Sequence, residues 1–342
     1  MNKRERVIEH IKGGQVDHLP NMPITMMFAA DWSGVPYHVY ATQASAMASA
    51  QMRVCEEFGF DHVSIISDPA VEAADLGAAV VFFEDQPPAL DDTLALLKDK
   101  SVLGRLAQIE PSSGRRMSNR IEGVRLLREQ VSKEILVEGW VEGPCAEGAD
   151  LRGINDLMTD FYDDPEFVSD LFAFVIDNAM RFARAQIDAG ADIIGVGDAA
   201  ASLVGPKLYR KFVLSFEKQL VDTIHAAGCL VRLHICGKTL GMAADIATLG
   251  CDIVDIDFPN PLDAVRAAVG PDTMLLGNLD PVRLLRDSPA IRVTREIEMC
   301  HSQAGARYIV GAGCEIPRDT AAPNIKALSS YARNRKPGEF TR

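Results

Sequence analysis

The sequence has few aromatic side chains and no long hydrophobic run. Aromatic residues make up 6% of its 342 residues, and Trp occurs only twice. No apolar stretch approaches the roughly 18 residues that a helix needs to cross a bilayer. The opening MNKRERVIEHIKGG is charged and amphipathic and lacks the apolar segment of a secretory signal. We therefore expect a cytoplasmic protein that does not span a membrane.

Basic residues are also scarce relative to acidic ones. The chain has 35 Lys and Arg against 48 Asp and Glu, a formal net charge of -13. Proteins that hold nucleic acid mainly through its phosphates carry a basic stripe, and none is visible here. The composition therefore excludes a nucleic-acid partner of that kind, although it does not indicate which face would meet a protein partner.

The hydrophobic pattern, in contrast, is rich and regular. Eight short apolar runs, rich in β-branched residues, alternate with longer helix-like segments. The runs span residues 23–28, 61–66, 135–141, 191–196, 230–235, 252–258, 273–279 and 308–310. Strands that alternate with helices form parallel sheets, and this number of βα units closes a barrel. We predict one α/β domain over residues 1–342, a (β/α)8 TIM barrel.

One stretch departs from the alternation. Residues 68–134 are too many for a single crossover, and they include the strand-like VVFFEDQPPAL and the polar PSSGRR. We interpret them as an insertion between the second and third strands.

Polar side chains gather where the predicted strands end. In a TIM barrel these carboxyl ends form one mouth, where active sites lie. The residues are Glu142, Asp198, His234, Cys236, Asp257, Asn278, Asp280 and Cys314. We therefore expect the active site at this mouth.

The motif LHICG places His234 and Cys236 two positions apart, on the same face of a strand. Cys314, in GAGCE at the end of the last strand, would meet them across the mouth. One imidazole and two thiolates favour zinc, and three protein ligands leave the open position of a catalytic site. The alternative is a hydrogen-bonded histidine with two buried cysteines that pack as small apolar groups.

The other residues at the mouth allow several roles. Glu142 is a candidate fourth zinc ligand when substrate is absent. Asp198 and Asp257 are candidate catalytic residues that hold substrate, move protons or orient His234, or they simply cap helices and loops. Gly237 and Asn278 are candidate cofactor-binding residues, and a glycine at 237 would let the backbone approach a ligand.

The chain has seven cysteines, an odd number. In a reducing compartment they are more typically free, metal-bound or reactive than disulfide-bonded. Cys236 and Cys314 are the candidate ligands, and the role of Cys145 stays open. Cys55, Cys229, Cys251 and Cys300 are expected in the core.

Several longer segments resemble the uroporphyrinogen decarboxylase superfamily. They are KRERVIEHIKGGQVDHLP, VEGWVEGPCAEGADLRGINDLM, IIGVGDAAASLVGPKLYRKFVLSF, LHICGKT, GNLDP and GAGCEIP, which together cover nearly the whole chain. His-x-Cys with a late Cys resembles the zinc-dependent corrinoid methyltransferases, the branch typified by methylcobalamin:coenzyme M methyltransferase.

The resemblance implies a cobalamin-dependent methyltransferase. It would hold zinc through His234, Cys236 and Cys314, and a partner corrinoid protein would supply the cobalamin. A methyl group would move between that protein and a thiol or similar acceptor, or in the reverse direction from a methyl ether, thioether or amine to cob(I)alamin.

The chain also departs from the decarboxylases of the superfamily. These carry an arginine-rich segment after the first strand, where this sequence reads ITMMFAADWSGVPY. A substrate with many carboxylates would find no cationic clamp there. The departure argues against a metal-free decarboxylase, the second alternative, which would use Asp198.

Overall fold

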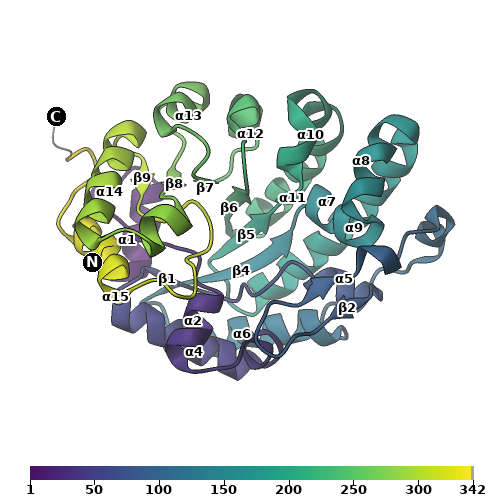
Figure 1. Ribbon diagram of the computed structural model, residues 1–342, viewed down its shortest axis with the longest axis horizontal. Coiled ribbons are helices and arrows are strands. Elements are labelled where there is room, and N and C mark those ends of the chain that lie inside the picture. The colour runs from purple at the N-terminus through teal and green to yellow at the C-terminus, as the bar shows by residue number, and fades with distance from the viewer. Residues whose placement is uncertain (340–342) are drawn as a thin grey trace.

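The computed structural model describes residues 1–339, and a curled parallel sheet forms its centre (Figure 1). Within these residues seven strands pair in the order β1-β4-β5-β6-β7-β8-β9. Their bounds are β1 His62–Ser64, β4 Leu136–Glu142, β5 Ile193–Gly197, β6 Leu230–Ile235, β7 Ile253–Ile256, β8 Leu275–Gly277 and β9 Tyr308–Ile309. Nearly all of their residues are buried, as is typical of parallel sheets covered by helices. The predicted α/β class is confirmed.

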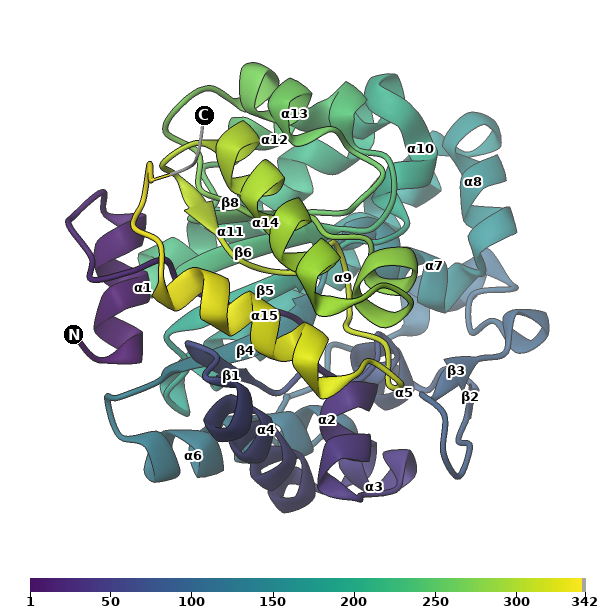
Figure 2. The same cartoon turned by 60° about the vertical axis from the view of Figure 1, so that its left-hand side comes forward.

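Helices cover the outside of the sheet (Figure 2). Outer helices contact one another in the order α14, α15, α4, α6, α9 and α11. The helices are α1 Lys3–Ile11, α2 Met27–Ser33, α3 Tyr37–Thr42, α4 Ala44–Phe58, α5 Val71–Leu76, α6 Arg115–Val131, α7 Pro144–Arg152, α8 Ile154–Asp163, α9 Pro165–Asp188, α10 Ala201–Leu208, α11 Leu214–Ala226, α12 Ala243–Ala247, α13 Leu262–Val269, α14 Ala290–Ala304 and α15 Ala322–Arg333. In the described part of the chain no helix combines the length and the apolar character needed to cross a bilayer.

The first predicted strand, 23–28, is wrong. The chain makes an isolated bridge at Asn21 instead, and α2 has begun by Met27. Met22 N donates to Val310 O at 2.9 Å, and Asp61 N donates to Asn21 O at 2.9 Å, so this segment links the two edges of the sheet. The apolar run misled the prediction because short buried helices and strands share the same pattern. The predicted eight-stranded barrel is therefore a seven-stranded sheet whose edges are joined by one bridging segment.

The connection between neighbouring strands β1 and β4 is long. It holds α5, the antiparallel pair β2 Val80–Val81 and β3 Ala89–Leu90, two short 3-10 turns (η1 Asp92–Leu94 and η2 Lys100–Arg105) and finally α6. The helix α6 packs against both α4 and β4 and is the crossover that a parallel pair requires. The interpretation of residues 68–134 as an insertion in one domain stays a prediction.

The inside of the sheet is layered. The lowest layer is apolar, and Val7 of α1 packs against it from the amino ends of the strands. Its members are Met22, Leu136, Ile193, Ile253, Met274, Leu276 and Ile309. Since alternate residues of a strand share a face, the positions two and four residues further along point into the layers above. Those layers carry the polar groups.

Candidate metal centre and its pocket

Three side chains that could hold a metal ion together meet at the carboxyl end of the sheet. His234 lies in β6, Cys236 follows that strand and Cys314 follows β9. His234 Nε2 lies 3.1 Å from Cys236 Sγ, and the two sulfurs are 3.7 Å apart. All ligand atoms of the group lie within 4.8 Å of one another. The structure thus brings together the three residues that the sequence analysis selected as metal ligands.

A buried ion-pair chain supports His234 from below. His234 Nδ1 lies 3.4 Å from Asp255 Oδ2, and the same oxygen accepts bonds from Arg232 Nε at 3.0 Å and Nη2 at 2.5 Å. Arg232 Nη1 also donates to Glu138 at 3.2 Å. The carboxylate therefore faces Nδ1 and leaves Nε2 directed at the sulfurs, the usual arrangement behind a metal-binding histidine.

Asp255 also governs the charge of the histidine. Burial lowers the pKa of His234 and the Asp255 carboxylate raises it, with a net rise to about 10. Burial alone would raise the pKa of Asp255, but Arg232 and His234 lower it below its usual value. Asp255 is therefore an ionised carboxylate inside the sheet.

The two thiols differ although they are adjacent. A hydrogen bond from Cys236 lowers the pKa of Cys314 to about 4 against the effect of burial. The same bond, together with burial, raises the pKa of Cys236. The hydrogen bond between the two sulfurs therefore favours the thiolate form of Cys314. Two sulfurs and one imidazole nitrogen at these separations fit a soft tetrahedral ion with one position open.

Glu142 lies near this group without joining it. Among the described residues, the side chains that could hold one metal ion together are His234, Cys236 and Cys314. One Glu142 oxygen accepts a hydrogen bond from Trp140 Nε1 at 3.0 Å. Burial and the neighbouring Glu72 raise the pKa of Glu142 well above its usual range. A role as fourth ligand stays a prediction.

Asp198 is enclosed beside the mouth. Its side chain has no exposed surface, and Oδ1 accepts a hydrogen bond from Ala146 N, in the first turn of α7, at 2.7 Å. Burial raises the pKa of Asp198 to about 7. The neighbouring Gly197 and Ala199 line the mouth pocket, whereas Asp198 is not among its described lining residues. Asp198 thus bonds the first turn of α7, and its candidate catalytic role stays a prediction.

Asp257 ties two loops of the mouth together. Its carboxylate accepts hydrogen bonds from Gly237 N at 2.6 Å and Phe258 N at 2.7 Å. Gly237 has a φ of 89°, a left-handed conformation that suits glycine. Asp257 and Gly237 therefore hold the loop that follows Cys236. The carboxylate beside His234 belongs to Asp255, whereas the sequence analysis named Asp257 as a candidate for that position.

The sequence analysis missed Asp255. The signal is in the register, because His234 and Asp255 are partners across β6 and β7. A single sequence does not contain that register, but the alternation in DIVDIDF does place Asp255 and Asp257 on one face.

The pocket above the metal-binding group encloses about 200 Å³. Its wall includes apolar groups of Ile24, Met26, Ile66 and Pro69 together with Trp140. Trp140 lies against β5, where Cβ atoms at Gly195 and Gly197 would come within 2.1 Å and 3.0 Å of the indole ring. Two glycines on one strand therefore make the space that this ring needs.

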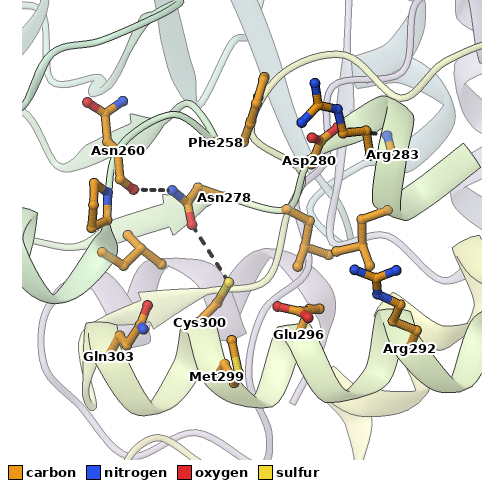
Figure 3. A pocket seen from close by; sticks show the side chains of 14 residues that line it. Phe258, Asn260, Asn278, Asp280, Arg283, Arg292, Glu296, Met299, Cys300 and Gln303 are labelled. Atoms are coloured by element: carbon orange, nitrogen blue, oxygen red, sulfur yellow. Dashed lines mark hydrogen bonds between the residues drawn. The ribbon is translucent and has the colours of Figure 1, made fainter. Parts of the chain in front are cut away.

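Asn278 faces a different hollow. Figure 3 shows it at the inner end of a pocket of about 340 Å³, between the loops after β7 and β8 and the helix α14. Its Nδ2 donates to Asn260 O at 2.6 Å, and its Oδ1 accepts from Cys300 Sγ at 3.7 Å. A cofactor-binding role for Asn278 stays a prediction, and this second pocket is where it would act.

The seven cysteines are all free. Cys55, Cys145, Cys229 and Cys300 are buried, whereas Cys251 is half-buried against the core. Burial, together with Asp198 and Glu217, raises the pKa of Cys145 well above its usual value, which makes it an unreactive thiol.

A family model and known proteins match most or nearly all of this chain. The model of the family Uroporphyrinogen decarboxylase (URO-D) matches residues 2–335. Methylcobamide:CoM methyltransferase MtbA of Methanosarcina mazei is 25% identical over 344 residues, which cover 97% of each chain. Uroporphyrinogen decarboxylase of Carboxydothermus hydrogenoformans is 24% identical over 280 residues, 80% of this chain and 78% of the relative.

Solved structures share the architecture. A methyltransferase from Methanosarcina mazei superimposes with a TM-score of 0.89 at 20% identity, and the match covers 97% of this chain and 98% of the other. A B12-independent methionine synthase from Shewanella sp. W3-18-1 has a TM-score of 0.55 at 14% identity, with 92% and 95% covered. These likenesses show the fold.

Proposed function

Since the chain belongs to the uroporphyrinogen decarboxylase family, we propose that it is a zinc-dependent methyltransferase that works with a corrinoid protein. It moves a methyl group between that protein and a thiol or similar acceptor. The supporting observation is the grouping of His234, Cys236 and Cys314 within 4.8 Å at the mouth. The chain also aligns over 97% of its length with a methylcobamide:CoM methyltransferase.

Zinc bound by these residues would lower the pKa of a thiol and keep it as a thiolate at neutral pH. When bound, the zinc would supply a thiolate nucleophile and the corrinoid a methyl group on cobalt(III); transfer would form a carbon–sulfur bond, break the cobalt–carbon bond and leave its electron pair on cobalt(I), with a thioether as the product.

The chain's own residues position these reactants. Asp255 keeps His234 turned so that Nε2 faces the sulfurs. Asp257 holds the loop after Cys236 through Gly237. The apolar wall would exclude water, so that the sulfur nucleophile would be less solvated. The enclosed pocket would also limit the positions that the reacting atoms can take.

Exposed apolar side chains support a protein partner at the mouth. Leu203, Leu240, Phe258 and Val282 are 64%, 37%, 45% and 42% exposed. They stand in or beside α10, η4 (Leu240–Met242), the loop after β7 and η5 (Pro281–Arg286), which directly follow β5, β6, β7 and β8. Apolar groups gathered on one rim are typical of interaction surfaces, so the corrinoid protein would dock there.

The pocket also argues against porphyrinogen decarboxylation. Asp68, Glu142 and Glu315 are among its lining residues, and among the described residues no Lys or Arg lines it. A substrate with many carboxylates needs the opposite arrangement.

The test combines metal analysis with methyl transfer. Protein purified under reducing conditions should contain about one zinc per chain. Cys314→Ser and Cys236→Ala should lose zinc and methyl transfer, assayed by the cobalamin spectrum in both directions. Cys251→Ser, a half-buried thiol before β7, is the matched control and should keep both.

Two results together would contradict the proposal: purified protein without zinc, and a Cys236→Ala variant that transfers methyl groups at the wild-type rate.

A further inference from the structure

The wall of the mouth pocket presents almost only apolar groups to a ligand. Its apolar lining residues are Ile24, Met26, Ile66, Pro69, Trp140 and Ala199. Within residues 1–339 no Lys or Arg joins them. The polar side chains of the lining are Asp68, Glu142, Glu315 and those of the metal-binding group. The charge that a ligand meets therefore depends on how these polar groups are bonded.

Asp68 brings no net charge to the pocket. Its side chain is fully buried, and both carboxylate oxygens accept bonds from Arg116, Oδ1 from Nη1 at 2.6 Å and Oδ2 from Nη2 at 2.7 Å. Arg120 lies 3.7 Å from the same carboxylate. Two guanidinium groups therefore neutralise Asp68 behind the wall. Turning either of them toward a ligand would break a buried ion pair, which is costly.

The other two acids also have no free charge to offer. Glu142 Oε1 accepts a bond from Trp140 Nε1 at 3.0 Å. Burial and the nearby Glu72 raise the pKa of Glu142 well above its usual range, so that this carboxyl is uncharged at neutral pH. Glu315 is directed at α2, where Met27 N donates to Oε1 at 2.6 Å. One acid is therefore neutral, and the other is bonded to the backbone.

The metal-binding group adds no net charge when zinc occupies it. The two thiolates of Cys236 and Cys314 would offset the two charges of the ion, and His234 would bind as a neutral imidazole. The carboxylate behind His234, Asp255, is paired with Arg232 below the pocket. A charged group of a ligand would therefore lose its hydration in this pocket and find no partner.

The size of the pocket limits the ligand further. An apolar cavity of about 150 Å³ takes up benzene, so the enclosed volume of about 200 Å³ holds a body of about one ring. Trp140 is 7% exposed, and the glycines at 195 and 197 let its ring lie against β5. Because the corrinoid protein would approach from the mouth, the remainder of the small molecule has to lie against this wall.

We infer that the small molecule methylated or demethylated here has an uncharged, apolar body of at most about one ring, as in a simple alkyl or aryl thiol or its methyl thioether. Its sulfur would lie at the metal-binding group, and its hydrocarbon part against Ile24, Ile66 and Trp140. This inference rests on the proposed function and names its substrate class. Thiols that end in an ammonium, carboxylate or sulfonate group are poor substrates, because the wall has no partner for that charge.

Thiols of matched size test the inference. 1-Propanethiol, 2-mercaptoethanol and 2-aminoethanethiol have equal numbers of non-hydrogen atoms and end in a methyl, a hydroxyl and an ammonium group, and mercaptoacetate supplies a carboxylate. The full-length, zinc-loaded protein receives methylcobalamin and one thiol. Each rate is divided by the rate without enzyme, which corrects for thiol reactivity. We expect kcat/KM to fall from the methyl to the hydroxyl end and to be at least about tenfold lower for both charged ends.

The methyl thioethers of the same thiols give dissociation constants without turnover. They carry no proton on sulfur, so calorimetric titration into the zinc-loaded protein compares the end groups alone. The propyl compound should bind at least about tenfold more tightly than either charged one. A charged thiol or thioether that reacts or binds as well as the propyl compound would overturn the inference. If no thiol is methylated in either direction, the proposed function fails, and the order of dissociation constants still decides which end group the pocket accepts.

A variant locates the selectivity. Met26 lines the pocket and is half-buried, and the unbranched stem of a lysine would follow its path. Met26→Lys should raise kcat/KM for mercaptoacetate relative to 1-propanethiol about tenfold. The matched control is Met27→Lys, at a half-buried neighbour that is not among the lining residues, and it should leave this ratio unchanged. An unchanged ratio in Met26→Lys would refute the placement of the substrate body in this pocket, and the wild-type series tests the substrate class independently of how the variant folds.

Discussion

Asp255→Asn tests whether the buried ion-pair chain serves the metal centre. The wild-type carboxylate is 2% exposed and faces His234 Nδ1 at 3.4 Å. An amide of the same shape removes the negative charge that the imidazole meets there. Because the site is closed, water does not replace that charge.

The expected magnitude follows from these contacts. Removing such a partner of a metal-binding histidine typically weakens metal affinity by about 10–100-fold, or about 1.4–2.7 kcal/mol. Arg232 also loses one of its two carboxylate partners and keeps Glu138 at 3.2 Å. The metal-free variant should therefore be less stable by about 2 kcal/mol.

Two assays separate these effects. Competition with a chromophoric chelator gives the zinc dissociation constant, and urea unfolding of the metal-free protein gives the stability. Asp263→Asn, at an exposed position of α13, should change neither. If Asp255→Asn lowers stability and binds zinc with wild-type affinity, then Asp255 is only a packing partner of Arg232 and our reasoning about the metal centre is wrong.

Three further perturbations test other parts of the molecule. Leu240→Glu should reduce methyl transfer with the corrinoid protein about tenfold and leave the rate with free methylcobalamin unchanged, because it places a charge on the docking rim. Gly195→Val should lower the free energy of unfolding by about 1–3 kcal/mol in urea, because its Cβ would lie 2.1 Å from the Trp140 ring. His10→Gln should flatten the fall in stability that occurs as pH drops from about 6.5 to 4, measured by unfolding at several pH values.

The sign of the last effect follows from the burial of the histidine. Burial lowers the pKa of His10 to about 4, so the unfolded chain binds a proton at a higher pH than the folded one. The stabilising contribution is complete above the unfolded value and is lost as pH falls through the folded one, by at most about 3 kcal/mol. Gln retains a donor for Tyr308 O, which lies 2.9 Å from His10 Nε2. Parallel pH profiles for wild type and variant would contradict this assignment.

The predictions for Leu240→Glu and Gly195→Val can also be contradicted. A Leu240→Glu variant that loses activity with free methylcobalamin as well would show damage to the site and not to docking. A Gly195→Val variant of wild-type stability would mean that the Trp140 ring moves without cost.

Local patterns were enough to predict seven of the strands and the proximity of the metal-binding group. Parallel strands buried on both faces leave continuous apolar runs such as those at 191–196 and 230–235. Alternation along β6 puts His234 and Cys236 on one face, and the rule that carboxyl ends of parallel strands share an edge brings in Cys314.

What the sequence did not reveal depends on relations between strands. The Trp140 ring fits only because glycines occupy the facing positions on β5, and that pairing follows from register. The first strand failed because its apolar run continues into α2, whose Phe28, Ala29 and Ala30 are buried. One continuous apolar segment therefore includes residues that follow an isolated bridge and residues that begin a helix.

The ion pairs inside the sheet make more sense as part of the site than as a source of stability. Glu138, Arg232 and Asp255 are at most 2% exposed, and pairs so deeply buried gain little over apolar residues of the same volume. The apolar layer below them, which includes Leu136, Ile253 and Ile309, already supplies a core. What the pairs do supply is an ionised Asp255, since Arg232 overcomes the burial that would protonate it. A neutral aspartic acid there would leave either nitrogen of His234 free to face the sulfurs, so the arginine two residues earlier in β6 sets which nitrogen is available to a metal ion.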